Sequence, residues 1–226
     1  MNERSRSGSD GAARRSAAPS SAGTDEPGVG PAPGATAPKD VWRSWARARR
    51  AALDVGAVSA AVRAALVPWL AAREPTTIVV YLATAHEVGV ARLAQEPALA
   101  AHRFATTRTP DHGPLTVHPL DARRERHRFG FEQPVADAAL VAHDDVGIVL
   151  VPGLAFSADG RRLGHGGGYY DRLLAALAHA TAVGVAAEAL VVPDVPTEAH
   201  DVAVGWLVTE AGVRRCAHAP IASQPE

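Results

Sequence analysis

A glycine-rich loop between an apolar run and an amphipathic segment, Leu150 to Leu174 (LVPGLAFSADGRRLGHGGGYYDRLL), restricts the possible folds of this chain most. The apolar run predicts a buried strand, and a helix is expected to begin at Tyr169. The loop carries two arginines and closes on glycines: Arg161, Arg162, Gly164, Gly166, Gly167 and Gly168. Glycines let backbone N–H groups approach an anion, and the first turn of a helix supplies unpaired donors and a positive dipole end. The order of strand, loop and helix therefore predicts a phosphate site in an α/β protein.

The glycine run by itself does not identify the site. It is not a Walker loop, because no Gly-Lys-Ser/Thr follows, and it is not a GxGxxG fingerprint, because Tyr169 stands in the place of the last glycine. A tight turn followed by a helix cap is the structural alternative.

Composition limits the class of protein. The 226 residues are 47% hydrophobic, which suits one globular domain, and the net charge of -1 gives no general reason to bind nucleic acid. The single cysteine, Cys216, excludes a disulfide framework within the chain and fits a reducing compartment. No apolar run approaches the roughly 20 residues of a membrane span, and the N-terminus lacks an apolar signal segment. We expect a cytoplasmic protein that binds neither membranes nor nucleic acid.

The chain divides into a tail at 1–38, a domain at 39–216 and a short C-terminal tail at 217–226. Residues 1–38 are rich in Ser, Ala, Gly and Pro and predict disorder, while a transit peptide, the alternative, is disfavoured by four acidic residues. Helices are expected over 41–53, 57–73 (with a kink or break at Pro68), 88–101 and 169–180. Strands are expected over 77–82, 103–107, 115–118, 147–151, 181–186 and 206–209. This alternation predicts a single three-layer α/β domain with a mainly parallel, Rossmann-like sheet, helices on both faces, and ligands beyond the C-terminal strand ends.

The string PGLAFSADGRRLGHGGGYYDR resembles the signature of the 5-formyltetrahydrofolate cyclo-ligase (5,10-methenyltetrahydrofolate synthetase) family, whose usual form is close to PGxAFDxxGxRLGxGxGYYDR. The resemblance covers about Lys39 to Glu210. It implies an enzyme of one-carbon metabolism, a ligase that uses ATP and Mg²⁺ to cyclise 5-formyltetrahydrofolate to 5,10-methenyltetrahydrofolate. Two alternatives stay open: a catalytically weak member that binds nucleotide or folate in a regulatory role, and an unrelated sugar-phosphate or CoA-type enzyme that shares only the sheet.

The resemblance also implies the residues that hold ATP. The segment KDVWR matches the family's K-x-x-L-R, whose Lys and Arg reach the ATP phosphates, so Lys39 and Arg43 carry over. Arg162 matches the arginine that neutralises charge on the transferring phosphoryl group, and Lys39 and Arg162 are the expected catalytic residues. The other expected ATP-binding residues are Gly164, His165, Gly166, Gly167, Gly168, Tyr169, Tyr170 and Asp171. From spacing alone, Lys39 could equally be a solvated residue at a helix start.

Glu87, Tyr170 and two aspartates complete the expected site. The segment YLATAHEVG resembles the family strand that runs into E-V-D, which implies that Glu87, with Tyr170, contacts the folate. Asp171, and with less support Asp201 of PTEAHD, would be Mg²⁺ ligands. Taken alone, Glu87 could be a surface charge, Asp171 a partner of the helix dipole and Asp201 part of a structural loop. The histidines lack the spacing of a zinc site.

The expected partners are ATP and 5-formyltetrahydrofolate, with or without a polyglutamate tail that the basic run 123–128 could attract. The chain is expected to be a monomer or a weak homo-oligomer. Several positions depart from the family pattern: Gly89, Leu115, Gly147, Ser157, Leu190 and Gly205. We expect these departures to weaken folate affinity and turnover more than nucleotide binding.

Overall fold

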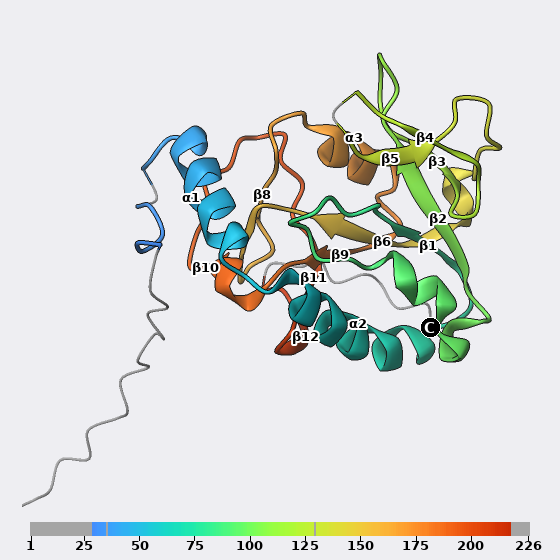
Figure 1. The fold of residues 1–226 in the computed structure, drawn as a ribbon, viewed down its shortest axis with the longest axis horizontal. Helices are drawn as coiled ribbons and strands as arrows, with labels where there is room; N and C mark the ends of the chain where they lie inside the picture. Colours follow the sequence, from blue (N-terminus) through green and yellow to red (C-terminus); the bar gives the residue numbers. More distant parts are fainter. Residues whose placement is uncertain (1–28, 35, 129, 218–226) are drawn as a thin grey trace, which may run out of the picture.

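The structure, a computed structural model, describes residues 29–34, 36–128 and 130–217. Its centre is a seven-stranded sheet with the order β12-β11-β9-β6-β1-β2-β3 (Figure 1). These strands are β1 (Thr77–Val80), β2 (Arg103–Arg108), β3 (Thr116–Pro119), β6 (Val146–Pro152), β9 (Thr181–Val185), β11 (Trp206–Thr209) and β12 (Gly212–Arg215). Neighbours from β11 to β2 pair in parallel, whereas the edge strands β12 and β3 pair antiparallel. The expected mainly parallel sheet is confirmed.

The two central strands are the most apolar. All of β1 is buried, and Val149, Leu150 and Val151 of β6 are fully buried. A strand that is covered on both faces has no solvent-facing positions for polar residues, so its sequence reads as a continuous apolar run. This is why the runs TIVV and GIVLV identify the middle of the sheet.

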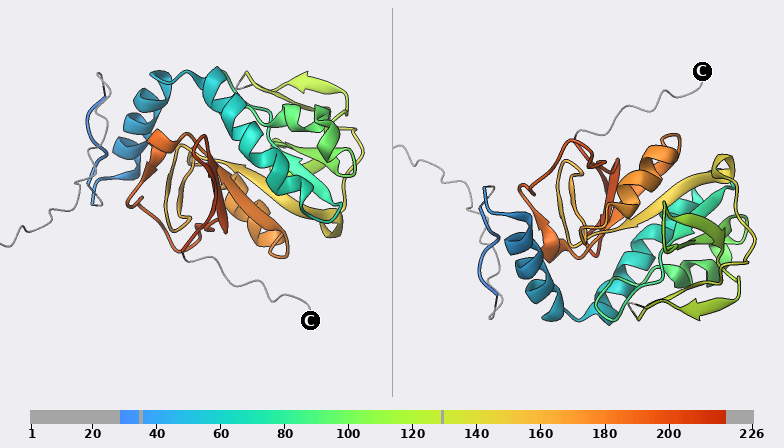
Figure 2. Two further views of the ribbon diagram at one scale, coloured as in Figure 1. Left: turned by 90° about the horizontal axis from the view of Figure 1, so that it is seen from below. Right: turned by 90° about the horizontal axis from the view of Figure 1, so that it is seen from above.

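Helices cover both faces of the sheet. α2 (Val55–Ala71) covers one face and α3 (Tyr169–Ala176) the other, whereas α1 (Lys39–Ala51) packs against a second, smaller sheet. The two helices lie on opposite faces of the sheet (Figure 2). Leu66 of α2 shares one apolar core with Leu150, while Leu173 of α3 shares the other with Val149. Among the described residues, no single helix is long and apolar enough to cross a membrane. Only α1 and α2 taken together, which are bent by 94° at their junction, have the length and composition of a membrane span.

A second, three-stranded sheet lies beside the first and supports α1. Its order is β10-β7-β8, and it consists of β7 (Ala155–Ser157), β8 (Arg162–Leu163) and β10 (Val191–Val192). Trp42 and Ala46 of α1 pack with Leu154 and Leu163 in a third apolar core. A further antiparallel hairpin joins β4 (Arg124–Arg126) and β5 (Glu132–Pro134). The small sheet matters because it fixes α1 beside the glycine loop.

The helix expected over 88–101 is wrong. The structure has two short 3-10 helices there, η1 (Ala91–Gln95) and η2 (Pro97–Leu99), and two more elsewhere, η3 (His143–Asp145) and η4 (Glu188–Leu190). Glu96 is extended, with φ -80° and ψ 119°, because a residue before proline is excluded from the helical region. By contrast, Pro68 does not break its helix, since α2 continues to Ala71.

The prediction of a disordered tail over 1–38 is wrong for the last part of this segment, which packs against α1. Trp45 Nε1 donates to Gly30 O at 2.9 Å, and Trp42 Nε1 donates to Gly34 O at 3.3 Å. Ala32 and Ala37 pack against the core beneath α1. Two indole donors therefore hold a segment whose composition predicts disorder. The predictions for 1–28 and for 218–226 lie outside the described residues.

Candidate functional site

A cavity of about 610 Å³ opens at the carboxyl ends of β1, β2 and β6, where ligands of parallel sheets bind. Thr107 of β2, Pro152 of β6 and Leu82 after β1 contribute to its wall. The cavity is also lined by every site residue expected from the sequence: Lys39, Arg43, Glu87, Arg162, Gly164, His165, Gly166, Gly167, Gly168, Tyr169, Tyr170, Asp171 and Asp201. The structure thus brings these residues together, while their roles toward nucleotide, folate and metal remain predictions.

The glycine loop, Gly164 to Gly168, has a shape that other residues would disturb. Gly166 and Gly168 have φ of +107° and +60°, and Gly168 is the N-cap of α3. Such left-handed backbone is readily adopted by glycine and costs energy for other residues. At Gly167 the constraint is steric, because there is no room for a side chain: a Cβ would lie 2.7 Å from the ring of Tyr169.

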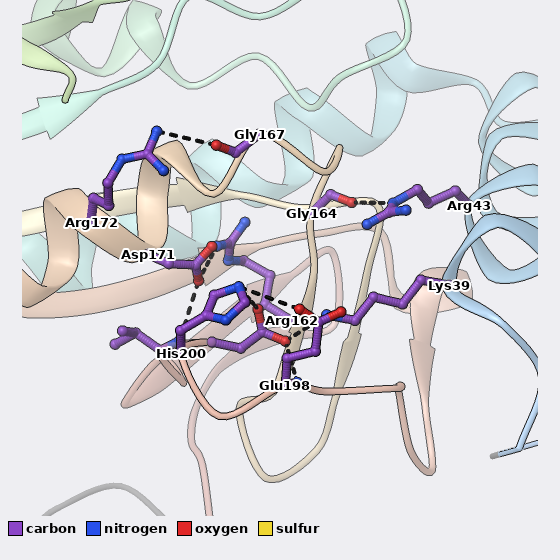
Figure 3. Close-up of polar contacts among 11 residues, drawn as sticks. Lys39, Arg43, Arg162, Gly164, Gly167, Asp171, Arg172, Glu198 and His200 are labelled. Carbon is purple, nitrogen blue, oxygen red and sulfur yellow. Dashed lines mark hydrogen bonds and ion pairs between the residues drawn. The ribbon is translucent and has the colours of Figure 1, made fainter. Parts of the chain in front are cut away.

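Two arginines fasten this loop through its carbonyl groups, which leaves its amides for a ligand. Arg43 Nε donates to Gly164 O and Arg172 Nη2 donates to Gly167 O, each at 3.1 Å (Figure 3). The first amides of a helix have no carbonyl partner within it, and in α3 the N–H of Arg172 bonds back to Gly168 O at 3.2 Å. The preceding amides of α3 are therefore available to an anion, as expected for a phosphate site.

Two cation–carboxylate pairs also line the cavity, and Figure 3 shows their contacts. Lys39 Nζ lies 2.8 Å from Asp201 Oδ2 and 3.1 Å from Glu198 Oε1. Arg162 Nη2 lies 2.7 Å from Asp171 Oδ1. Burial disfavours the charged forms, but the hydrogen bonds and charges between Lys39 and its partners outweigh it, so the pKa of Lys39 is raised and that of Asp201 lowered.

These pairs are joined by the backbone of one segment. Glu198 N donates to Asp201 Oδ2 at 2.8 Å, and Val202 N donates to Asp171 Oδ1 at 3.2 Å. The segment 196–202 therefore connects the start of α1 to the start of α3. Arg162 is 8% exposed, and its Nε is a buried donor without a hydrogen-bond partner among the described residues. An unpaired buried donor is costly, so this group suits an anionic ligand.

The described residues include no group of three or more His, Cys, Asp or Glu side chains that could hold a metal ion. Asp171 and Asp201 line the cavity, but each is already paired with a cation. Mg²⁺ that arrives with a nucleotide needs only one or two carboxylates, because phosphate oxygens and water complete its coordination. These two carboxylates therefore fit a nucleotide-bound Mg²⁺ better than a resident ion.

Glu87 follows β1 and lies deep in the cavity, with its side chain 10% exposed. Thr84 donates to Glu87 Oε2 from its N–H and from its hydroxyl, both at 2.9 Å. His165 Nε2 lies 3.4 Å from Oε1, and Arg50 Nη1 lies 3.8 Å from the same oxygen. Burial raises the pKa of Glu87, but hydrogen bonds from His165 and Thr84 and the charge of Arg50 outweigh it and lower this pKa to about 2. Glu87 is therefore a carboxylate at neutral pH.

The wall beside Glu87 is aromatic and apolar. Leu115, Phe131, Tyr81 and Tyr170 line it. Burial raises the pKa of both tyrosines, so that their hydroxyls stay protonated. An apolar wall with a few fixed polar groups is typical of a small-molecule binding pocket.

Three side chains that shape the site are not predicted by the sequence analysis: Arg50, Thr84 and Glu198. Arg50 lies seven residues after Arg43, on the same helix face, and Thr84 lies three residues before Glu87. Among the positions that depart from the family pattern, only Leu115 lines the cavity, whereas Leu190 is buried in the core beneath α1. Most departures therefore lie outside the site.

Comparison with known proteins identifies the family. The sequence profile of the 5-formyltetrahydrofolate cyclo-ligase family matches residues 43–210. The 5-formyltetrahydrofolate cyclo-ligase of Mycolicibacterium smegmatis is 39% identical over 85 residues, which are 36% of this chain and 43% of that protein. The mitochondrial 5-formyltetrahydrofolate cyclo-ligase of Arabidopsis thaliana is 34% identical over 85 residues, which are 33% of this chain and 31% of that protein. The matched segment thus spans less than half the length of either relative.

Solved structures agree over a larger part of the chain. The NMR structure of Aquifex aeolicus 5,10-methenyltetrahydrofolate synthetase has a TM-score of 0.66 and 26% identity, and the match covers 83% of this chain and 96% of that one. The Mycoplasma pneumoniae 5,10-methenyltetrahydrofolate synthetase, at 20% identity, has a TM-score of 0.63 over 76% of this chain and 98% of that one, which supports the fold. The profile, the fold and the glycine-loop signature agree that the chain belongs to the 5-formyltetrahydrofolate cyclo-ligase family.

Proposed function

We propose that this protein catalyses the ATP-dependent cyclisation of 5-formyltetrahydrofolate to 5,10-methenyltetrahydrofolate, with release of ADP and phosphate. Family membership supports the proposal. The observation that carries it is the contact between His165 of the glycine loop and Glu87, at 3.4 Å. This contact puts a phosphate-binding loop and a buried carboxylate in one cavity, which a reaction between a nucleotide and a second substrate requires.

The proposed reaction has two chemical steps. The formyl oxygen attacks the γ-phosphorus, and ADP leaves. The lone pair of N10 then attacks the activated formyl carbon, the oxygen departs with the phosphate, and N10 loses its proton. The charge that moves onto the transferring phosphoryl group can be neutralised by Lys39 and Arg162, which line the cavity.

The protein's other contribution is orientation. The glycine loop and the first amides of α3 would hold the phosphates, because their donors are available to a ligand. Glu87, fixed by Thr84, would hold the pteridine or the formyl group against the nucleotide. Tyr170, whose ring lines the same cavity, would contact both substrates.

Mg²⁺ belongs to the proposal as the partner of ATP, with Asp171 and Asp201 as the carboxylates that would hold it. When bound, it would supply positive charge against the phosphate oxygens of ATP. Arg162 and Lys39, released from these carboxylates, would then face the phosphates. A polyglutamate tail could lie along the basic run 123–128, part of which forms β4 near Phe131 in the cavity wall. A cytoplasmic location and a monomeric or weakly associated state remain part of the proposal.

The test is a spectrophotometric assay for 5,10-methenyltetrahydrofolate with purified protein, 5-formyltetrahydrofolate, ATP and Mg²⁺. Product should depend on both ATP and Mg²⁺. Arg162→Met should lower kcat by at least about a hundredfold. Arg161→Met is the matched control, because the adjacent Arg161 is exposed and pairs with Asp159 and Asp194. Circular dichroism confirms that both variants fold. Nucleotide binding without ATP-dependent product would favour the regulatory alternative.

A further inference from the structure

Arg50 is a buried arginine next to the proposed site that does not line its cavity. It belongs to α1 and is 9% exposed. Its Nη2 donates to Gly153 O, and its Nη1 lies 3.8 Å from Glu87 Oε1. Gly153 directly follows β6, and Glu87 lies beyond the end of β1. The guanidinium therefore bridges one helix to the ends of the two central strands.

This position is energetically demanding. Removing a guanidinium from water is costly unless charged or hydrogen-bonding partners compensate. Burial lowers the pKa of Arg50, and the nearby Glu87 carboxylate opposes that change. A carbonyl acceptor alone leaves the positive charge uncompensated, whereas Glu87 supplies the opposite charge. The two side chains are thus a buried ion pair that forms between segments far apart in the sequence.

The contacts of Glu87 show what the pair does. Its Oε2 accepts two hydrogen bonds from Thr84, which fixes one end of the carboxylate. Its Oε1 lies between His165 on the cavity side and Arg50 on the far side. A small cavity of about 10 Å³ is lined by both members of the pair, together with Tyr81 and Gly153. This is about the space of one water. At 3.8 Å, the contact between Arg50 and the carboxylate is an ion pair and is too long for a direct hydrogen bond.

The same helix face also holds the loop that Glu87 contacts. Arg43 bonds to Gly164 O, after β8, and Arg50 bonds to Gly153 O, before β7. The two arginines, seven residues apart, therefore fasten α1 to both ends of the hairpin that leads into the glycine loop. Loss of Arg50 would free the carboxylate on the strand side while Arg43 still held the glycine loop.

We infer that Arg50 is a positioning residue for the reaction, which holds the Glu87 carboxylate in the orientation that reaches the second substrate and the glycine loop. The inference rests on the function proposed above. Arg50 itself touches no substrate and acts through Glu87. Its effect should therefore fall on 5-formyltetrahydrofolate more than on ATP, and it should disappear when Glu87 no longer carries a charge.

The experiment is a double-mutant cycle of Arg50→Met and Glu87→Gln. Arg50→Met should lower kcat/KM for 5-formyltetrahydrofolate about tenfold, while the affinity for ATP measured without folate should change less than threefold. Glu87→Gln should cost about the same, and the double variant should be about tenfold, not a hundredfold, worse than the wild type. Arg50→Lys, which keeps the charge but not the fork of donors, should lose only about threefold.

Arg47→Met is the matched control, because Arg47 is an exposed arginine one turn earlier in α1; it should behave as the wild type. If the double variant lost about a hundredfold in kcat/KM, the two single losses would be independent and the inference would be overturned. Equal losses of ATP affinity and of kcat/KM for 5-formyltetrahydrofolate in Arg50→Met would overturn it as well. If Arg50→Met does not fold, the cycle is measured with Arg50→Lys instead. A loss of kcat/KM in the double variant equal to the product of the two single losses would then contradict the inference.

A failure of the proposed function is distinguishable. If the wild type makes no product, calorimetric binding of 5-formyltetrahydrofolate replaces kcat/KM in the cycle. Arg50→Met should then weaken this binding about tenfold, and binding equal to that of the wild type would refute the positioning role.

Discussion

Glu87→Gln should remove a pH-dependent contribution to the stability of the fold. The pKa of Glu87 lies at about 2 rather than 4.5, which is worth about 3 kcal/mol in favour of the ionised folded state at pH 7. The unfolded chain binds the proton near pH 4.5 and the folded chain only near pH 2. The contribution is therefore complete above about pH 5 and is lost as the pH falls through 2. Glutamine keeps the shape of the side chain but removes the charge.

The assay is urea unfolding of the wild type and of Glu87→Gln at pH values from 7 down to 3. At pH 7 the variant should be less stable by as much as about 3 kcal/mol, and this gap should narrow by about 2 kcal/mol at pH 3. Asp201 and Glu188 also have lowered pKa values, but both proteins share them, so their effect cancels in the gap. Glu74→Gln, at an exposed residue before β1, should show no such gap. A constant gap across this range would refute the reasoning about the Glu87 network.

Four further outcomes follow from the site. At neutral pH, Glu87→Gln should lower kcat/KM for 5-formyltetrahydrofolate at least about tenfold, equivalent to roughly 1.4 kcal/mol; steady-state kinetics with saturating ATP measure this, and an unchanged value would exclude a folate contact. Lys39→Ala should raise the KM for ATP and lower kcat, since a phosphate loses a charge worth about 2 kcal/mol; unchanged ATP kinetics would reduce it to a structural residue. Gly167→Val should abolish ATP binding in calorimetry while circular dichroism stays unchanged, because a Cβ would lie 2.7 Å from the neighbouring tyrosine ring. Deleting residues 1–28 should hardly change the melting temperature, whereas deleting 1–38 should lower it by several degrees, because two indole hydrogen bonds are lost; equal melting temperatures would contradict the packing of the second segment.

The sequence predicts those parts of the fold that local pattern determines. The apolar run at 147–151 becomes β6, and the glycine string with its flanking helix becomes the loop and α3, because burial on both faces and glycine geometry leave few alternatives. Lys39 and Arg43 share a face of α1 by spacing alone. Their place at the cavity, however, depends on the packing of α1 against the small sheet, which no local pattern predicts.

The remaining features depend on contacts between distant segments. β8 and β10 are two residues long each, too short for a periodic pattern, and they form because they pair with β7. The tail at 29–34 is placed by indole donors that its own composition does not indicate. Arg50 looks in the sequence like any other arginine of α1, and only the fold shows that it lies between two strand ends.

Lys39 has a consequence for the chemistry of the whole molecule, because it is the only lysine in the chain. Amine-directed reagents therefore have one side-chain target, and that target lies in the wall of the cavity. Its ammonium group, held by Asp201 and Glu198, must give up these partners before it can react. The rate of labelling thus reports on the cavity directly, and a covalent probe attached there would sit beside the glycine loop without any engineered handle.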